Sequence, residues 1–231
     1  MMELTAEKLA RIIDHSKLQP NATEQEIIDF CKVVKKYKFV AAFVLPVNLS
    51  VARSELAGNG FTKLGTGIGF PFGTHTTKTK ILECEEAVAL GAEELDMVIN
   101  IGALKSGNFN LVRSELESVP AAIGNIPLKA ILEVSYLTPQ EIRDGARICC
   151  DTRLAFVKTG TGFGTRATTL EDVRLITEVV GGRIGVKVAG GVQNISTLLD
   201  MYLLGVTRFG VSRGDQIIEE FNRLFKGRLV I

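Results

Sequence analysis

The chain has 231 residues and a formal net charge of +1 at pH 7. Hydrophobic residues make up 46% of it and charged residues 23%, a balance that argues against intrinsic disorder and allows a large core. The near-neutral charge gives no electrostatic reason to expect nucleic acid or an anionic membrane as a partner. The N-terminus lacks a basic start and an apolar run, and no stretch approaches the roughly 18 uncharged residues of a membrane span. We therefore expect a cytoplasmic protein with neither partner, which holds any anion locally.

Short β-branched segments alternate with amphipathic segments along the whole chain, without a linker between them. This alternation is typical of repeated βα units. The segments at 129–132 and 185–188 show little polar alternation, which indicates strands buried on both faces, as in a parallel sheet. Eight strands close a (β/α)8 barrel, a TIM barrel, so we predict one such domain over residues 1–231. The expected strands are 12–15, 39–45, 62–68, 94–99, 128–133, 155–158, 184–189 and 207–211.

Helices are expected between these strands, together with a short extra helix near the N-terminus. Thr23 has Glu26 three positions further on, which is the spacing of a capping box, and Pro139 stands at a first helical turn. An open, doubly wound sheet is the alternative fold. The segment 65–70 partly imitates the dinucleotide-binding glycine pattern but lacks its following acidic residue. The expected helices include 24–37, 76–90, 139–150, 170–180 and 216–225.

Metal and disulfide chemistry have little support in the sequence. The four cysteines show no C-x-x-C spacing, and two of them are adjacent, so we expect buried thiols. The chain has only two histidines, which do not make a good zinc site. We therefore expect no metal and no cofactor.

Four charged residues lie at strand positions from which a barrel can present side chains to an active site. Asp14 is expected at the end of the first strand, Asp96 within the fourth, Lys158 at the end of the sixth and Lys187 within the seventh. Lys158 follows two apolar residues and precedes a small-residue loop, so it is a candidate carbonyl nucleophile. Amine attack needs the neutral form, which partial burial and a second cation, such as Lys187 on the adjacent strand, would favour.

Asp96 would be an unpaired carboxylate among apolar neighbours unless a cation binds it. A Lys187–Asp96 pair would remove that cost and supply an acid and a base. The pair could equally be structural, and Lys158 could be a solvated charge at a strand end. Lys129 is placed at a strand start, where the stability face of the barrel is expected.

Two glycine-rich segments follow the seventh and eighth expected strands. Gly190 and Gly191 follow the seventh, and the segment 210–214 follows the eighth and leads into a helix. Loops at these places often bind phosphate through backbone N–H groups. The sequence therefore predicts a local anion site.

Several motifs are similar to those of deoxyribose-phosphate aldolases. The most specific is D-M-V-I-N-I-G-A-L-K-S-G at 96–107, and others are I-G-F-P-F-G at 68–73, F-V-K-T around Lys158, and V-K with the glycine pair that follows Lys187. The resemblance extends across nearly the whole chain, from Ile13 to Ser212.

This resemblance implies a class I aldolase that reversibly cleaves 2-deoxy-D-ribose 5-phosphate to D-glyceraldehyde 3-phosphate and acetaldehyde. It implies that Lys158 forms the imine, that Asp96 and Lys187 form the proton-transfer pair, and that Asp14 lies by the sugar hydroxyls. No metal takes part in that chemistry. Further substrate contacts are expected at Thr159, Gly162, Gly190, Gly191, Gly210, Ser212 and Arg213.

The chain departs from the family pattern near the expected site. Gly160 replaces a usual serine, and Gln193 stands where some members have a basic residue. We hypothesise that Arg213, alone or with Arg166, restores the lost positive charge. The other departures are Val188, Val44 and Pro46, of which the last two stand where cysteine and asparagine are common.

Two other functions stay open at this point. One is a Schiff-base aldolase on the same scaffold that acts on a different phosphorylated carbonyl compound. The other is a non-catalytic protein that binds a sugar phosphate. A homodimer or homotetramer is expected, although no apolar stripe identifies its interface.

Overall fold

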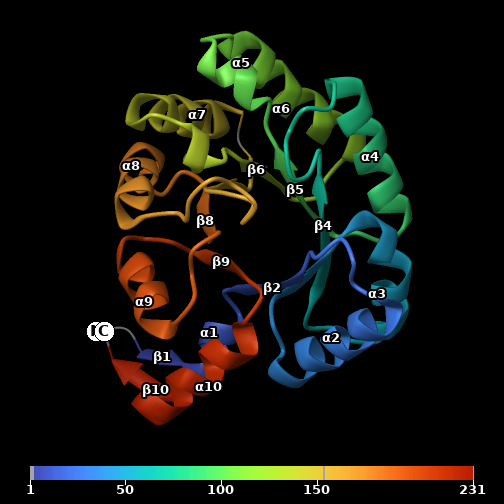
Figure 1. Ribbon diagram of the computed structural model, residues 1–231, viewed down its shortest axis with the longest axis vertical. Helices are drawn as coiled ribbons and strands as arrows, with labels where there is room; N and C mark the ends of the chain where they lie inside the picture. Colours follow the sequence, from blue (N-terminus) through green and yellow to red (C-terminus); the bar gives the residue numbers. More distant parts are fainter. Residues whose placement is uncertain (1–2, 153, 231) are drawn as a thin grey trace.

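Eight parallel strands form a closed barrel in the computed structural model, which describes residues 3–152 and 154–230. The strands follow one another around the barrel in chain order, and β9 pairs with β2 to close it (Figure 1). That pairing confirms the (β/α)8 fold and excludes the open, doubly wound alternative. The barrel strands are β2 Ile13–Lys17, β3 Ala41–Val44, β4 Lys63–Ile68, β5 Glu94–Val98, β6 Leu128–Ile131, β7 Phe156–Lys158, β8 Gly185–Ala189 and β9 Arg208–Val211.

A ring of α-helices surrounds the barrel (Figure 1). The capping box predicted at Thr23 and Glu26 is present at the start of α2, and Pro139 begins α7. The five expected helices are confirmed to within two residues at each end. The ring consists of α2 Glu24–Tyr37, α3 Leu49–Glu55, α4 Thr77–Ala89, α5 Ile101–Lys105, α6 Phe109–Ile123, α7 Pro139–Asp151, α8 Leu170–Val180, α9 Ile195–Leu203 and α10 Gly214–Phe225.

The two ends of the described chain meet outside the barrel. The short N-terminal helix that was expected is α1 (Ala6–Ala10), and it packs against α10. Strand β1 (Glu3–Thr5) pairs antiparallel with β10 (Arg228–Val230), and these two strands were not predicted. In Figure 1 they lie beside α1 and α10, away from the barrel strands.

The apolar core fills the space between the strands and the helices. Strand β6 is buried along its whole length and β8 along all but its first residue, as their apolar sequences predicted. All four cysteines are buried free thiols, also as expected. Among the described residues, no helix is both long and apolar enough to cross a membrane.

Charged side chains occupy part of the barrel interior. Lys158 is the last residue of β7, and Asp96 and Lys187 lie in the middle of β5 and β8, as predicted. Asp14 differs from its expected place: it is the second residue of β2, because that strand continues to Lys17 through pairing with β3. Asp14 is therefore fully buried inside the barrel instead of standing at its rim.

Candidate active site

Asp96 binds both lysines that were expected to react. Lys158 Nζ donates to Asp96 Oδ2 at 2.7 Å, and Lys187 Nζ donates to the same oxygen at 2.6 Å. The two lysines face each other across adjacent strands, because β7 and β8 pair with Lys158 opposite Lys187. A third ammonium group, that of Lys129, lies 3.0 Å from Asp96 Oδ1. The expected Lys187–Asp96 pair is thus present, within a larger group.

The Asp96 carboxylate stays ionised in this setting. Burial by itself would raise its pKa, but the ammonium groups of Lys129, Lys158 and Lys187 outweigh burial and hold the pKa well below its usual range. Asp96 is therefore a fixed negative charge that keeps the lysines together.

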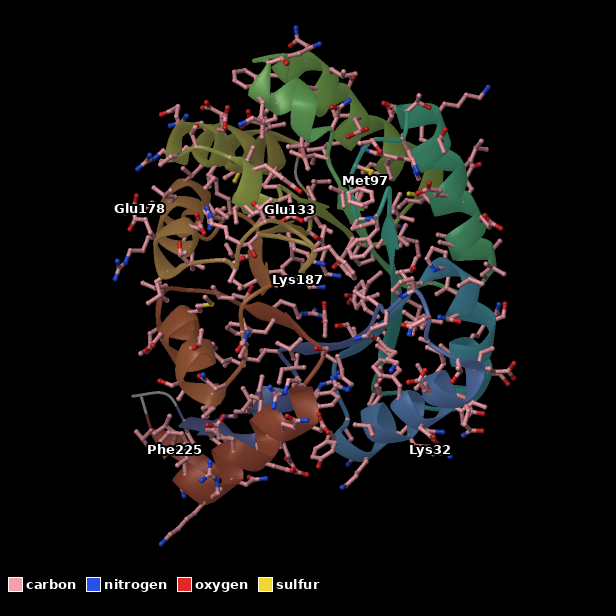
Figure 2. All side chains as sticks on the ribbon, viewed as in Figure 1. Lys32, Met97, Glu133, Glu178, Lys187 and Phe225 are labelled. Atoms are coloured by element: carbon pink, nitrogen blue, oxygen red, sulfur yellow. The ribbon has the colours of Figure 1, made fainter. Side chains whose placement is uncertain are left out.

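Lys187 lies near the centre of the ring of helices (Figure 2), between the carboxylates of Asp14 and Asp96. Its Nζ is 2.5 Å from Asp14 Oδ2 and 2.6 Å from Asp96 Oδ2, and it lies 3.9 Å from the centre of the Phe43 ring. Burial lowers the pKa of Lys187 to about 8, and the nearby Lys158 and Lys129 act in the same direction, against the two carboxylates. A lysine with this pKa can exchange a proton near neutral pH.

Lys129 belongs to the interior of the barrel, although it was expected on the stability face. It is fully buried, and its ammonium group lies 2.7 Å from Glu94 Oε2 as well as beside Asp96. The reason is register, because β6 pairs with β5 so that Lys129 stands opposite Asp96. This contact could not be predicted from the sequence, because the offset between neighbouring strands is not visible in either strand alone.

Arg208 and Glu94 extend the group on the side of Asp14, and neither was singled out from the sequence. Arg208 Nη1 lies 2.7 Å from Asp14 Oδ1 and 3.4 Å from Glu94 Oε2. Burial alone would raise the pKa of Asp14, but Lys187, Lys129 and Arg208 together lower it. Asp14 is therefore a second ionised carboxylate, and its contacts are with cations.

Seven side chains thus form one continuous group, called the charged cluster below. It contains four basic and three acidic side chains, so it carries one excess positive charge when all are ionised. Loss of one proton would bring the net charge of the cluster to zero. Interacting groups of this kind release protons as a unit. The cluster consists of Asp14, Glu94, Asp96, Lys129, Lys158, Lys187 and Arg208.

A cavity of about 490 Å³ opens above the charged cluster. Lys158, Lys187 and Asp14 line its inner part, and Phe43 and Phe163 contribute aromatic walls. The glycine segments that follow β7, β8 and β9 line most of the rest, together with Ser16, Leu18 and Gln19 at the end of β2. Of the expected substrate contacts, Gly162, Gly190, Gly191, Gly210, Ser212 and Arg213 all line this cavity, as does Gln193.

The loops after β7 and β8 touch each other through glycine. Gly162 and Gly190 have φ angles of 88° and 77°, which favour glycine, and a Cβ on Gly190 would lie 3.1 Å from both N and Cα of Gly162. Backbone N–H groups of closely packed glycine loops can approach an anion without side chains between them. This end of the cavity therefore suits a phosphate group.

Four residues considered in the sequence lie outside the cavity lining. Thr159 does not line the cavity, because its buried hydroxyl bonds to the backbone of Ala189 at 3.1 Å. Arg166 is also outside the cavity lining, since its guanidinium group forms two bonds to Asp172, at 2.6 and 3.0 Å. Val44 and Pro46, one buried and one exposed, are likewise absent from the lining. Val188 is buried beside Lys187. Arg213 does line the cavity, so the hypothesis of an added positive charge near the phosphate now rests on Arg213 alone.

In residues 3–152 and 154–230, no group of three or more His, Cys, Asp or Glu side chains is arranged to hold a metal ion. The acidic side chains of the charged cluster instead contact lysine and arginine.

Comparison with known proteins matches residues 8–217 to the DeoC/LacD family of aldolases. A deoxyribose-phosphate aldolase of Rhizobium meliloti is 43% identical over 90% of this chain and 84% of its own length. One of Methanothermobacter thermautotrophicus is 44% identical over 93% of this chain and 96% of its own. A solved structure of a tetrameric deoxyribose phosphate aldolase from Aeropyrum pernix has a TM-score of 0.87 and 25% identity, and the match covers 95% of this chain and 93% of that one.

Proposed function

The chain belongs to the DeoC/LacD family of aldolases, and we propose that it cleaves 2-deoxy-D-ribose 5-phosphate through an imine on Lys158. The products are D-glyceraldehyde 3-phosphate and acetaldehyde, and the reaction is reversible. One observation carries the proposal: Lys158 and Lys187 share Asp96 Oδ2 at the inner end of a cavity that glycine loops complete. The names of the relatives support the substrate.

The first step is attack of the neutral Lys158 amine on C1 of the open-chain aldehyde. The nitrogen loses a proton and the former carbonyl oxygen gains one, which gives a carbinolamine. The carbinolamine hydroxyl then takes up one further proton and leaves as water, which gives a protonated imine.

The imine is the electron sink for breaking the C2–C3 bond. Neutral Lys187 takes the proton of the C3 hydroxyl, the bond electrons flow into the imine to give an enamine, and C3 becomes the aldehyde carbon of glyceraldehyde 3-phosphate. Lys187 then returns that proton to C2 of the enamine. Addition of water then releases acetaldehyde, the free amine and the proton taken up when the imine formed. A pKa of about 8 suits Lys187 for both transfers near neutral pH.

The remaining residues of the site hold the two lysines in place and bind the phosphate. Asp96 keeps Lys158 and Lys187 at one oxygen, and Asp14 orients Lys187 from the other side. The loops with Gly162, Gly190, Gly191, Gly210 and Ser212 receive the phosphate through their backbone N–H groups, with Arg213 at their edge. The tetrameric relative supports a homo-oligomer for this chain.

The test of the substrate is a direct assay. Purified protein is incubated with 2-deoxyribose 5-phosphate, and glyceraldehyde 3-phosphate is measured by a coupled dehydrogenase, with and without a chelator. We expect turnover that the chelator leaves unchanged and that Lys158→Met abolishes. Faster turnover of another phosphorylated aldehyde or ketone than of 2-deoxyribose 5-phosphate would instead support a Schiff-base aldolase with a different substrate. Binding without turnover would support a sugar-phosphate binding protein.

A further inference from the structure

Glu133 has an unusual backbone conformation just beyond the end of β6. Its φ angle is 56°, in the left-handed region that disfavours residues with a Cβ by about 1–2 kcal/mol. Among the described residues, the other non-glycine residues with positive φ are Lys38 and Lys226, and both cap the ends of helices. Glu133 instead precedes the short 3-10 helix η2 (Val134–Tyr136). Its conformation therefore needs a different explanation.

The backbone on both sides of Glu133 is attached to the strand that carries Lys158. Leu132 N donates to Lys158 O at 3.0 Å, and Val134 N donates to Thr159 O at 2.9 Å. Glu133 is the residue between these two bonds. Its position is thus set by β7, and its side chain reaches the loop that follows β7.

The Glu133 carboxylate is buried, with an exposed fraction of 3%, and it is bound by that loop and by Ser135. Glu133 Oε2 accepts from Thr161 N at 3.1 Å and from the Thr161 hydroxyl, and Oε1 accepts from Ser135 Oγ at 3.3 Å. None of the ion pairs found in the described part of the chain involves Glu133. A buried carboxylate without a cation depends on such hydrogen bonds.

The same hydrogen bonds shape the loop around Gly162. Thr161 Oγ1 donates to Glu133 and accepts from Phe163 N at 2.9 Å, so both neighbours of Gly162 are held. Space for the carboxylate comes from two further glycines, since a Cβ on Gly160 or Gly164 would lie 2.8 or 2.7 Å from Glu133 Oε1. The carboxylate therefore occupies a slot that the loop forms around it. Figure 2 shows Glu133 inside the ring of helices, near β6.

We propose that Glu133 is a positioning residue that, through Thr161, holds the loop at 160–164 so that Gly162 faces the phosphate of the substrate. The proposal rests on the function proposed above. Glu133 does not line the cavity, and it acts only through the loop. Lys158 is held independently, by strand pairing on both sides and by Asp96. Loss of Glu133 should therefore affect phosphate recognition and leave the amine in place.

The main variant is Glu133→Gly, which removes the carboxylate and suits a φ of 56°. We expect the KM for 2-deoxyribose 5-phosphate to rise roughly tenfold or more, the size expected for losing hydrogen bonds to a buried charge, with kcat little changed. The preference for phosphorylated over unphosphorylated 2-deoxyribose should fall by the same factor. Trapping of acetaldehyde on Lys158 by borohydride should proceed at the wild-type rate.

Two matched variants separate positioning from a general loss of structure. Glu133→Gln keeps an oxygen that can accept from Thr161, and its amide group can donate to Ser135, so it should restore most of the phosphate preference. Thr161→Val keeps the shape of the side chain and removes the hydroxyl, and it should reproduce the effect of Glu133→Gly. The double variant should be no worse than either single one.

An unchanged KM and phosphate preference in Glu133→Gly would overturn the proposal. An equal loss with phosphorylated sugar, unphosphorylated sugar and acetaldehyde trapping would also overturn it, because that pattern indicates a structural role. Calorimetric binding of inorganic phosphate separates this proposal from the aldolase function, since it requires no turnover. If the wild type binds phosphate but cleaves no sugar, the proposed function fails, and weaker phosphate binding by Glu133→Gly still supports the role of Glu133.

Discussion

Lys187→Met is expected to stabilise the protein while abolishing turnover. The substitution removes an ammonium group that is buried in the charged cluster and replaces it with an apolar side chain of similar length. Removing one partner of a buried ion pair usually destabilises by about 3–5 kcal/mol, because it leaves a carboxylate uncompensated. Here the cluster has four basic and three acidic side chains, so the variant has equal numbers of each.

The size of the effect follows from the pKa of Lys187. Burial lowers that pKa from 10.5 to about 8, and at about 1.4 kcal/mol per pKa unit the difference corresponds to about 3 kcal/mol. Between about pH 8 and 10.5 the unfolded chain keeps a proton that folded Lys187 has released, so wild-type stability rises with pH across this window. Below pH 8 both states are protonated, and the full cost remains.

The assay is urea unfolding of wild type and Lys187→Met at several pH values from 7 to above 10. We expect the variant to be more stable by up to about 3 kcal/mol at pH 7, with the difference closing as the pH approaches 10.5. Titrating groups outside the charged cluster contribute equally to both proteins and cancel in the comparison. A variant that is several kcal/mol less stable at pH 7, or a difference that does not depend on pH, would refute the reasoning.

Three further predictions concern single side chains. Asp96→Asn leaves the ammonium groups around it without their shared carboxylate and should destabilise by about 3–5 kcal/mol in urea unfolding; a stable variant would contradict this. Arg213→Ala should raise the KM for the phosphorylated sugar roughly tenfold, and no rise would reject the hypothesised phosphate contact. Burial lowers the pKa of His15 from 6.5 to about 4, so the unfolded chain gains a proton first and the wild type should lose about 3 kcal/mol as pH falls from 6.5 to 4. His15→Gln should lack this loss, and identical acid profiles would count against it.

Sequence patterns were sufficient to predict the barrel because its elements are local. Each expected strand is a short apolar segment, and the capping box at Thr23 marks the start of α2 in the sequence itself. Strands β1 and β10 could not be found in this way, because each has only three residues and their pairing joins opposite ends of the chain. Their stability depends on contact with each other and with the neighbouring helices α1 and α10.

The candidate site shows the same division between local and non-local information. Lys158 and Lys187 could be located because a strand end and a strand middle are visible in the sequence. The place of Lys129 depends on the register between β5 and β6, which the sequence does not display. The conformation of Glu133 was equally hidden, since nothing in its neighbours requires a positive φ for a residue with a side chain.

Reductive trapping tests the central claim most directly. The protein is incubated with acetaldehyde, treated with borohydride and digested, and the modified peptide is located by mass spectrometry, with Lys158→Met as the control. We expect an N-ethyl group on Lys158 in the wild type and none at that position in the control. Modification of Lys187 or Lys129 in place of Lys158, or no modification together with activity that a chelator abolishes, would contradict the imine mechanism.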